Sequence, residues 1–120
     1  MIPGHRHATE DCRAVSEILS RVGDKWTVLV VSTLGDGAKR FNELRKALGS
    51  ISQRMLTLTL RGLERDGLVA RSVTATVPVR VDYALTPLGR GLLGVVDSVA
   101  QWADRHVPEL HAARRDHDGG

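Results

Sequence analysis

Apolar residues recur at helical spacing along the first half of the chain, and they predict three helices. Thr9 and Asp24 stand where helix N-caps are favoured. Gly23, Gly35 and Gly49 follow the expected ends. The apolar positions are Cys12, Val15, Ile18, Leu19 and Val22 in the first helix, Trp26, Leu29, Val30 and Leu34 in the second, and Phe41, Leu44 and Leu48 in the third.

The stretch "SISQRMLTLTLRGLERDGLV" (residues 50–69) predicts a fourth helix that begins after Ser52 and ends near Gly67. Leu56, Leu60 and Leu63 lie at i, i+4 and i+7 and form its buried stripe. A short turn containing glycine separates it from the third helix, which is a helix-turn-helix arrangement. The opposite face of this helix is centred on Arg54, Leu58, Arg61 and Arg65, so that Leu58 lies among polar residues.

After Gly67 the period of the apolar positions changes from helical to two, which predicts a β-hairpin. Val69, Arg71 and Val73 run outward, and the chain returns from Val79 to Leu85. The tip is "TATVP", residues 74–78. A hairpin directly after a helix-turn-helix predicts a winged helix-turn-helix fold, mainly α with a small β-hairpin.

A last helix is predicted after Thr86, with Pro87 at its first position. Its apolar stripe is too wide for a single core contact, and it runs through Leu88, Leu92, Val95, Val96, Val99, Ala100, Trp102, Ala103 and Val107. Residues 1–8 are expected to be a flexible arm and residues 109–120 a flexible polar tail. Between them, residues 9–108 form one domain.

The charge of the chain is concentrated in its middle. The whole chain carries +3, but residues 39–71 contain eight basic and three acidic residues and carry +5. A local basic surface indicates an anionic partner, with nucleic acid the first candidate. A solvated basic face without a partner explains the charge alone equally well.

The outer face of the fourth helix has side chains that suit DNA. Arginine binds guanine through two hydrogen bonds, glutamine does so with adenine, and hydroxyls bind phosphates or base edges. A helix N-terminus also attracts phosphate. The alternative is a protein-interaction module that does not bind DNA, although interaction faces usually carry aromatics. The candidate DNA-binding residues are Lys39, Arg40, Arg45, Ser52, Gln53, Arg54, Thr57, Leu58, Arg61 and Arg80, with Arg71 as the alternative on the wing.

Other classes of function have little support in the sequence. The single cysteine excludes an internal disulfide and fits a reducing cytoplasm, and no apolar run is long enough for a membrane span. No nucleophile elbow, phosphate loop or HExxH motif is present, so an enzyme is not expected. His5, His7 and Cys12 lack a fourth ligand at fixed spacing, so neither a metal site nor a cofactor is predicted.

From Cys12 to about His106 the chain resembles the HxlR-type family of bacterial winged-helix transcription regulators. The resemblance rests on "GDKW", "RFNELRKAL", "ISQRMLTLTLRGLERDGLVAR", "VPVRVDYALTPLG" and Trp102. The "RFNEL" and "DYALTPLG" stretches disfavour other winged-helix families, such as the MarR-like and ArsR-like ones. The family usually has a second glycine where Asp24 stands, and often a polar residue where Leu58 stands.

The resemblance implies a homodimer formed through the first and last helices, which accounts for the wide apolar stripe. It also implies a palindromic DNA site and, in several members, a response to oxidants or electrophiles through a cysteine at the position of Cys12. That residue lies in a first helical turn, where the helix dipole favours a thiolate. Cys12 as a small packing residue is the alternative. The candidate interface residues are Val15, Leu19, Leu92, Val96, Val99 and Trp102.

Overall fold

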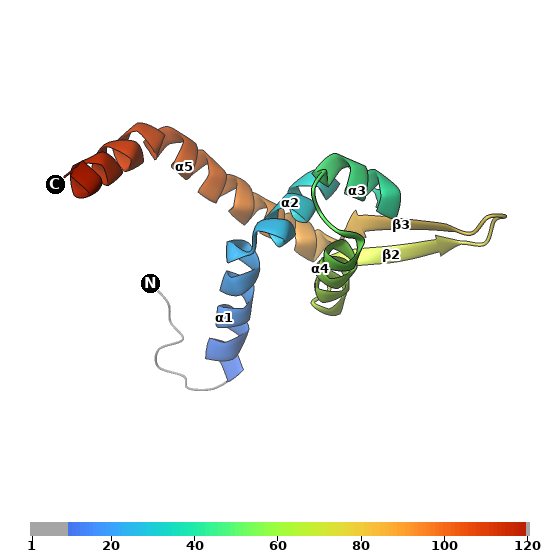
Figure 1. Ribbon diagram of the computed structural model, residues 1–120. Coiled ribbons are helices and arrows are strands. Elements are labelled where there is room, and N and C mark those ends of the chain that lie inside the picture. The colour runs from blue at the N-terminus through green and yellow to red at the C-terminus, as the bar shows by residue number, and fades with distance from the viewer. Residues whose placement is uncertain (1–9, 120) are drawn as a thin grey trace.

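The computed structural model describes residues 10–119, which form a helical body with a small antiparallel sheet (Figure 1). The β2/β3 hairpin projects from one side of the body, and α5 extends away on the other. The arm expected at residues 1–8 and the cap expected at Thr9 lie outside the described residues. The elements are α1 (Glu10–Gly23), α2 (Lys25–Leu34), β1 (Lys39–Arg40), α3 (Phe41–Leu48), α4 (Gln53–Arg65), β2 (Val69–Thr74), β3 (Arg80–Leu85) and α5 (Pro87–Gly119).

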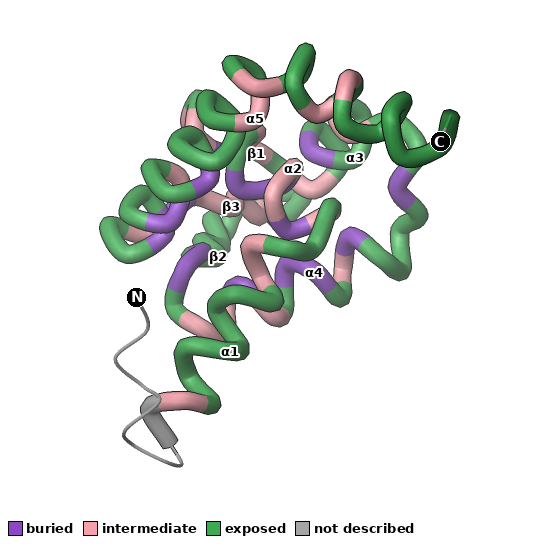
Figure 2. Tube along the Cα trace, turned by 90° about the vertical axis from the view of Figure 1, so that its left-hand side faces the viewer, coloured by how far each residue is buried: buried purple, intermediate pink, exposed green. Residues whose placement is uncertain are grey.

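The hydrophobic core lies where α2, α3, α4 and the first half of α5 meet, and most of the outer surface of α1 and α5 is exposed (Figure 2). Leu34, Leu44 and Leu56 are fully buried. Each such side chain contributes about 1.5–3 kcal/mol relative to leaving it in water. Thr27 is also buried, and its Oγ1 donates to the carboxylate of Asp24 at 2.8 Å. The predicted cap of α2 is therefore tied to the core.

The sheet has three strands in the order β1-β3-β2, whereas the sequence predicted only a two-stranded hairpin. The hairpin itself is confirmed, with Val69 opposite Leu85. The additional strand β1 pairs Lys39 with Tyr83. A strand of two residues is too short to show a period of two, so the pattern could not reveal it. The pairing holds the start of α3 against the base of the hairpin.

Helix α5 begins as predicted, because the Thr86 hydroxyl accepts a hydrogen bond from the Gly89 N–H at 3.0 Å. It continues to Gly119, so residues 109–119 form part of α5, where the sequence predicts a flexible tail. Pro108 lies inside this helix and does not end it. Ala112, Ala113, Arg114 and Arg115 are strong helix formers, and no glycine interrupts the segment before Gly119.

Candidate nucleic-acid interface

Helix α4 is fixed at both ends, which determines the direction of its outer face. The Ser52 Oγ accepts a hydrogen bond from the Met55 N–H at 3.0 Å, which confirms the predicted N-cap. At the other end, Gly67 has a φ of +74°, and the Leu68 N–H donates to the Leu63 carbonyl at 2.9 Å. The predicted buried stripe is confirmed and gains one threonine, so that it comprises Leu56, Thr59, Leu60 and Leu63.

The opposite face of α4 is exposed and mostly polar, as predicted. Leu58 has 51% of its surface exposed, so it is an outward-facing leucine and not a misplaced core residue. Thr57 is half-buried because it faces the sheet. The fully exposed polar members of the face are Gln53, Arg54, Arg61 and Arg65.

A basic groove separates α4 from the base of the hairpin. Its volume is about 570 Å³. Three arginines line it: Arg61 and Arg65 come from α4, and Arg71 comes from β2. Their combined charge exceeds that of the single carboxylate in the groove, Glu64. The groove therefore offers three guanidinium groups to an anionic ligand, beside the exposed face of α4. We name it the α4/wing groove.

Glu64 and Tyr83 form the inner wall of the α4/wing groove. The Glu64 carboxylate lies 3.8 Å from the Arg71 Nε. Burial raises the pKa of Tyr83, the nearby Glu64 raises it further, and Arg71 and Arg61 act in the opposite direction. The phenol therefore stays protonated at neutral pH and can donate a hydrogen bond into the groove. The sequence identified Tyr83 only as a strand residue, because its approach to α4 depends on tertiary packing.

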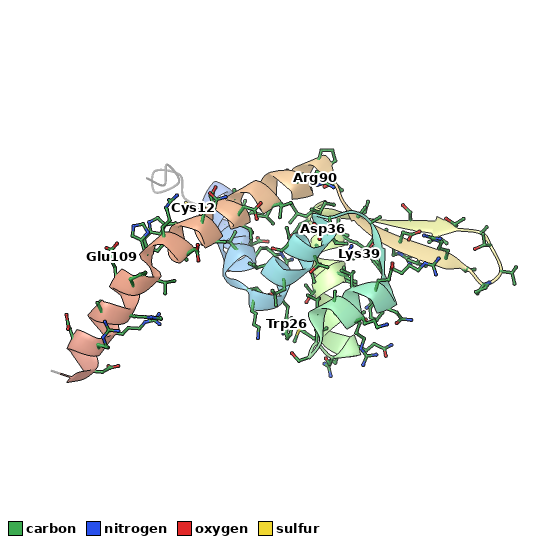
Figure 3. All side chains as sticks on the ribbon, turned by 90° about the horizontal axis from the view of Figure 1, so that it is seen from above. Cys12, Trp26, Asp36, Lys39, Arg90 and Glu109 are labelled. Atoms are coloured by element: carbon green, nitrogen blue, oxygen red, sulfur yellow. The ribbon has the colours of Figure 1, made fainter. Side chains whose placement is uncertain are left out.

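The basic residues before and on α3 occupy different environments. Lys39 is half-buried in β1, whereas Arg45 is exposed on the last turn of α3. The Arg40 backbone N–H donates to Glu43 Oε1 at 2.7 Å, so Glu43 holds the backbone of Arg40 at the start of α3 while the Arg40 side chain stays exposed. Figure 3 shows Lys39 at the base of the sheet, next to the helical body.

Arg80 does not line the α4/wing groove. It lies with Arg40 on a second cleft of about 730 Å³, between α3 and the hairpin tip. Its Nε is 3.0 Å from Asp82 Oδ2, so part of its charge is neutralised. Between the alternatives raised by the sequence, Arg71 is the wing arginine beside α4. The tip itself carries exposed apolar side chains, namely Val73, Val77 and Val79.

A second exposed surface, on α1 and α5, is apolar. Val15, Leu19, Val99 and Trp102 are exposed, between 39% and 55% of each. The other two predicted interface residues are not exposed. Leu92 and Val96 are buried, at 7% and 5%, because they lie on the part of α5 that belongs to the hydrophobic core. Ile18 and Val95 are exposed instead and extend the apolar surface, although the sequence did not select them. We name the exposed set the α1/α5 face: Val15, Ile18, Leu19, Val95, Val99 and Trp102.

Cys12 lies in the first turn of α1 and is partly buried. Figures 1 and 3 show that the start of α1, where Cys12 is labelled in Figure 3, lies far from the hairpin. His5 and His7 are outside the described residues. Among the side chains of residues 12–119, no group of three or more metal-ligating residues is close enough to hold an ion. In the same range, no helix has the length and apolar character of a membrane span.

Helix α4 follows α3 after a short turn and is followed directly by the β2/β3 hairpin. This arrangement defines a winged helix-turn-helix protein. Comparison with known proteins agrees. A family model described as "HxlR-like helix-turn-helix" matches residues 21–111. The HTH-type transcriptional regulator YdeP of Bacillus subtilis is 44% identical over 107 residues, which are 87% of this chain and 84% of YdeP.

Solved structures are also similar. The redox regulator HypR in its reduced form has a TM-score of 0.75 and 42% identity, covering 82% of this chain and 98% of HypR. Diamide-treated YodB from Bacillus subtilis has a TM-score of 0.70 and 35% identity, covering 88% of this chain and 94% of YodB. The chain therefore belongs to the HxlR-like helix-turn-helix family of transcriptional regulators. None of these three relatives is named as an enzyme.

Proposed function

We propose that this protein binds double-stranded DNA in a sequence-specific manner, as a homodimer, with α4 in the major groove. The observation that carries the proposal is the exposed polar face of α4 directly beside the arginine-lined α4/wing groove. An α-helix fits the major groove, and arginine and glutamine are the side chains that read guanine and adenine there. A hairpin in this position contacts the DNA backbone or minor groove.

The candidate residues divide into two groups by what they can reach. Those on the outer face of α4 meet base edges, whereas residues before α4 and on the hairpin meet phosphates. The Ser52 hydroxyl still has its proton to donate to a phosphate while it caps α4. In this proposal Gln53, Arg54, Leu58 and Arg61 face bases, and Thr57 reaches the DNA from the side of the α4/wing groove. The residues that face phosphates are Lys39, Arg40, Arg45, Ser52, Arg71 and Arg80.

The proposed homodimer forms through the α1/α5 face. An exposed apolar surface of this kind marks an interaction site on a soluble protein. It continues into an apolar hollow of about 210 Å³ lined by Val22, Val28, Val96, Val99 and Ala100. An apolar side chain from a second copy would fill this hollow and remove its lining from water. A two-fold dimer presents two copies of α4 to a palindromic site.

Salt dependence of DNA binding tests the proposal. We expect the logarithm of the affinity to fall linearly with the logarithm of salt concentration, with a slope of several units. Arg54→Ala should weaken binding to a specific site by about 1–3 kcal/mol, and random DNA much less, if Arg54 meets a base. An equal loss on random DNA would place Arg54 on a phosphate instead.

A matched control separates the site from general charge. Arg114 and Arg115 are exposed on α5, distant in sequence from α4. We expect the pair Arg54→Ala and Arg61→Ala to abolish specific binding, and the pair Arg114→Ala and Arg115→Ala, which removes the same charge, to leave it within about twofold. Equal losses from the two pairs would refute α4 as the reading helix, and no binding of the wild type at low salt would refute the DNA-binding function.

The second candidate function is a protein-interaction module that does not bind DNA. The exposed valines at the hairpin tip favour it, because apolar side chains at a projecting tip suit protein contact. A protein-interaction module of this kind does not require Arg54 or Arg61 for binding to its partner protein. The same two double variants therefore separate the two functions.

We also propose that Cys12 is the site of a response to oxidants or electrophiles. What supports this is its position on α1, the helix that carries part of the proposed interface, and the family's inclusion of HypR, whose structures are described as oxidized and reduced forms. Two Cys12 thiols, one from each subunit, and one molecule of hydrogen peroxide would give an intersubunit disulfide and two molecules of water. A mixed disulfide and an adduct with an electrophile are the other products open to a single cysteine.

Cys12→Ser tests this part of the proposal. We expect the variant to bind DNA like the wild type and to keep that affinity when an oxidant or a quinone is added. The affinity of the wild-type protein should change under the same treatment. A thiol reductant should restore it after the oxidant, which forms a disulfide, but not after the quinone, which forms a thioether. A Cys12→Ser variant that responds like the wild type would leave Cys12 as a packing residue.

A further inference from the structure

The side chain of Arg21, in the last turn of α1, reaches the C-terminal part of α4. Its Nε donates to Asp66 Oδ2 at 2.8 Å, and its Nη2 donates to the Gly62 carbonyl at 3.3 Å. Both side chains of the ion pair are largely shielded, with 29% and 23% exposed. Two hydrogen bonds from one guanidinium fix direction as well as distance.

The sequence of α4 is suited to this contact in two ways. A Cβ at position 62 would lie 2.7 Å from the Arg21 Nη1, so glycine allows the guanidinium to lie directly against the helix, and a larger residue would displace it. Asp66 directly follows α4, at the negative end of the helix dipole, where a carboxylate is unfavourable unless a cation compensates it. Arg21 supplies that cation. The contact with Arg21 therefore accounts both for the glycine at position 62 and for the aspartate at position 66.

The contact joins two helices that both pack on α2. Helix α1 packs mainly on α2, and it carries Val15, Ile18 and Leu19 of the α1/α5 face. Helix α4 packs mainly on α2 and β2. Arg21 thus connects the helix of the proposed dimer interface directly to the helix of the proposed DNA-reading face.

We propose that Arg21 is a positioning residue for DNA recognition, acting through Asp66 and Gly62 to hold α4 at a fixed angle to α1. The inference rests on the proposed function. In a homodimer formed through α1 and α5, the orientation of α4 relative to α1 sets the distance between the two copies of α4. Arg21 therefore determines which spacing of DNA half-sites the dimer accepts, without contacting DNA itself.

The experiment measures affinity for three duplexes at one salt concentration: a genome-selected site, the same site with one base pair inserted at its centre, and random DNA. Arg21→Met keeps a side chain of comparable reach without charge, and Arg13→Met on an exposed position of α1 is the matched control. We expect Arg21→Met to weaken binding to the selected site about tenfold and to reduce its preference over the inserted site by a similar factor. The affinity of Arg21→Met for random DNA should change less than about threefold. Arg13→Met should bind all three duplexes like the wild type.

Further variants separate positioning from general loss of structure. Asp66→Asn should give the same loss of spacing preference as Arg21→Met, and the double variant should lose no more than either alone. Arg21→Lys keeps the charge and can still reach Asp66, so it should recover part of the preference even if Arg21→Met lowers the Tm. Sedimentation of each variant should still show a dimer.

Three results would overturn the inference. An equal loss on all three duplexes would mean that Arg21 acts through its charge or through overall stability. A wild-type spacing preference in Arg21→Met, while the wild type binds DNA, would remove Arg21 from recognition and leave the proposed function intact. Wild-type protein that binds no duplex would refute the proposed function, and the role of Arg21 with it.

Discussion

Arg71 on β2 and Glu64 on α4 face each other across the α4/wing groove, with 3.8 Å between Nε and Oε1. Glu64 is the one carboxylate that lines this groove, among three arginines. Its negative charge therefore repels an anionic ligand and also neutralises part of the positive charge of Arg71. Both effects weaken with salt, because the pair is partly exposed.

Glu64→Gln should consequently strengthen DNA binding. The neutral amide keeps the shape of the side chain and removes the repulsion, and we expect a gain of about two- to fivefold on specific and random DNA alike. Fluorescence anisotropy over a range of salt concentrations measures it, and the gain should shrink as salt rises. Weaker binding by Glu64→Gln would mean that the carboxylate holds Arg71 in the geometry that DNA requires.

Leu58 is predicted to select a base by apolar contact. It is exposed in the middle of the polar face of α4 and cannot hydrogen-bond a base, but it can pack on a thymine methyl group. Leu58→Gln should change the preferred base at one position of each half-site from T toward A, and Leu58→Ala should weaken the preference for T. Selection from a randomised duplex pool measures both. An unchanged selected site with Leu58→Gln would make Leu58 an exposed residue without a role in reading.

Leu92 and Val99 are seven residues apart on α5 and share nearly the same side of the helix, but Leu92 is buried in the core and Val99 is exposed. Their variants should therefore fail in different ways. Leu92→Ala removes a buried side chain and should lower the free energy of unfolding by about 2–5 kcal/mol. Val99→Asp places a charge on the α1/α5 face and should dissociate the dimer while each chain stays folded. Chemical denaturation and sedimentation velocity distinguish the two. A Val99→Asp protein that remains a dimer would exclude this face as the interface.

Gly89 and Gly91 give a matched pair of stability predictions. A Cβ at Gly89 would overlap the backbone carbonyl of Leu68, whereas a Cβ at Gly91 meets no atom within 4 Å. Gly91→Ala should stabilise the protein by about 0.5–1 kcal/mol, because alanine favours a helix. Gly89→Ala should destabilise it, because the strand and helix backbones must separate. The Tm from thermal unfolding measures both, and equal shifts would contradict the close approach at Gly89.

Much of this fold could be predicted from local sequence patterns. The caps Asp24, Ser52 and Thr86 and the buried stripe of α4 were predicted, because capping and helical periodicity depend on residues within one or two turns. The hairpin was predicted for the same reason, since its alternation is local. The winged helix-turn-helix class followed from the order of these elements.

The features that the sequence could not predict depend on residues far apart along the chain. Arg21 and Asp66 are 45 positions apart, and neither helix pattern alone indicates that they meet. The pairing of β1 with β3 likewise joins distant segments. The wide stripe of α5 showed that two faces were apolar, but only packing against α2 shows that Leu92 belongs to the core and Val99 to the surface.

The most direct test of the central claim is selection of bound fragments from genomic DNA, followed by footprinting of the enriched site with the wild type and with the Arg54→Ala and Arg61→Ala double variant. The account predicts an inverted repeat whose half-sites are centred about one helical turn, roughly 34–36 Å, apart and protected by one dimer. The double variant should show no protection there. Fragments without an inverted repeat, or protection that survives in the double variant, would contradict it.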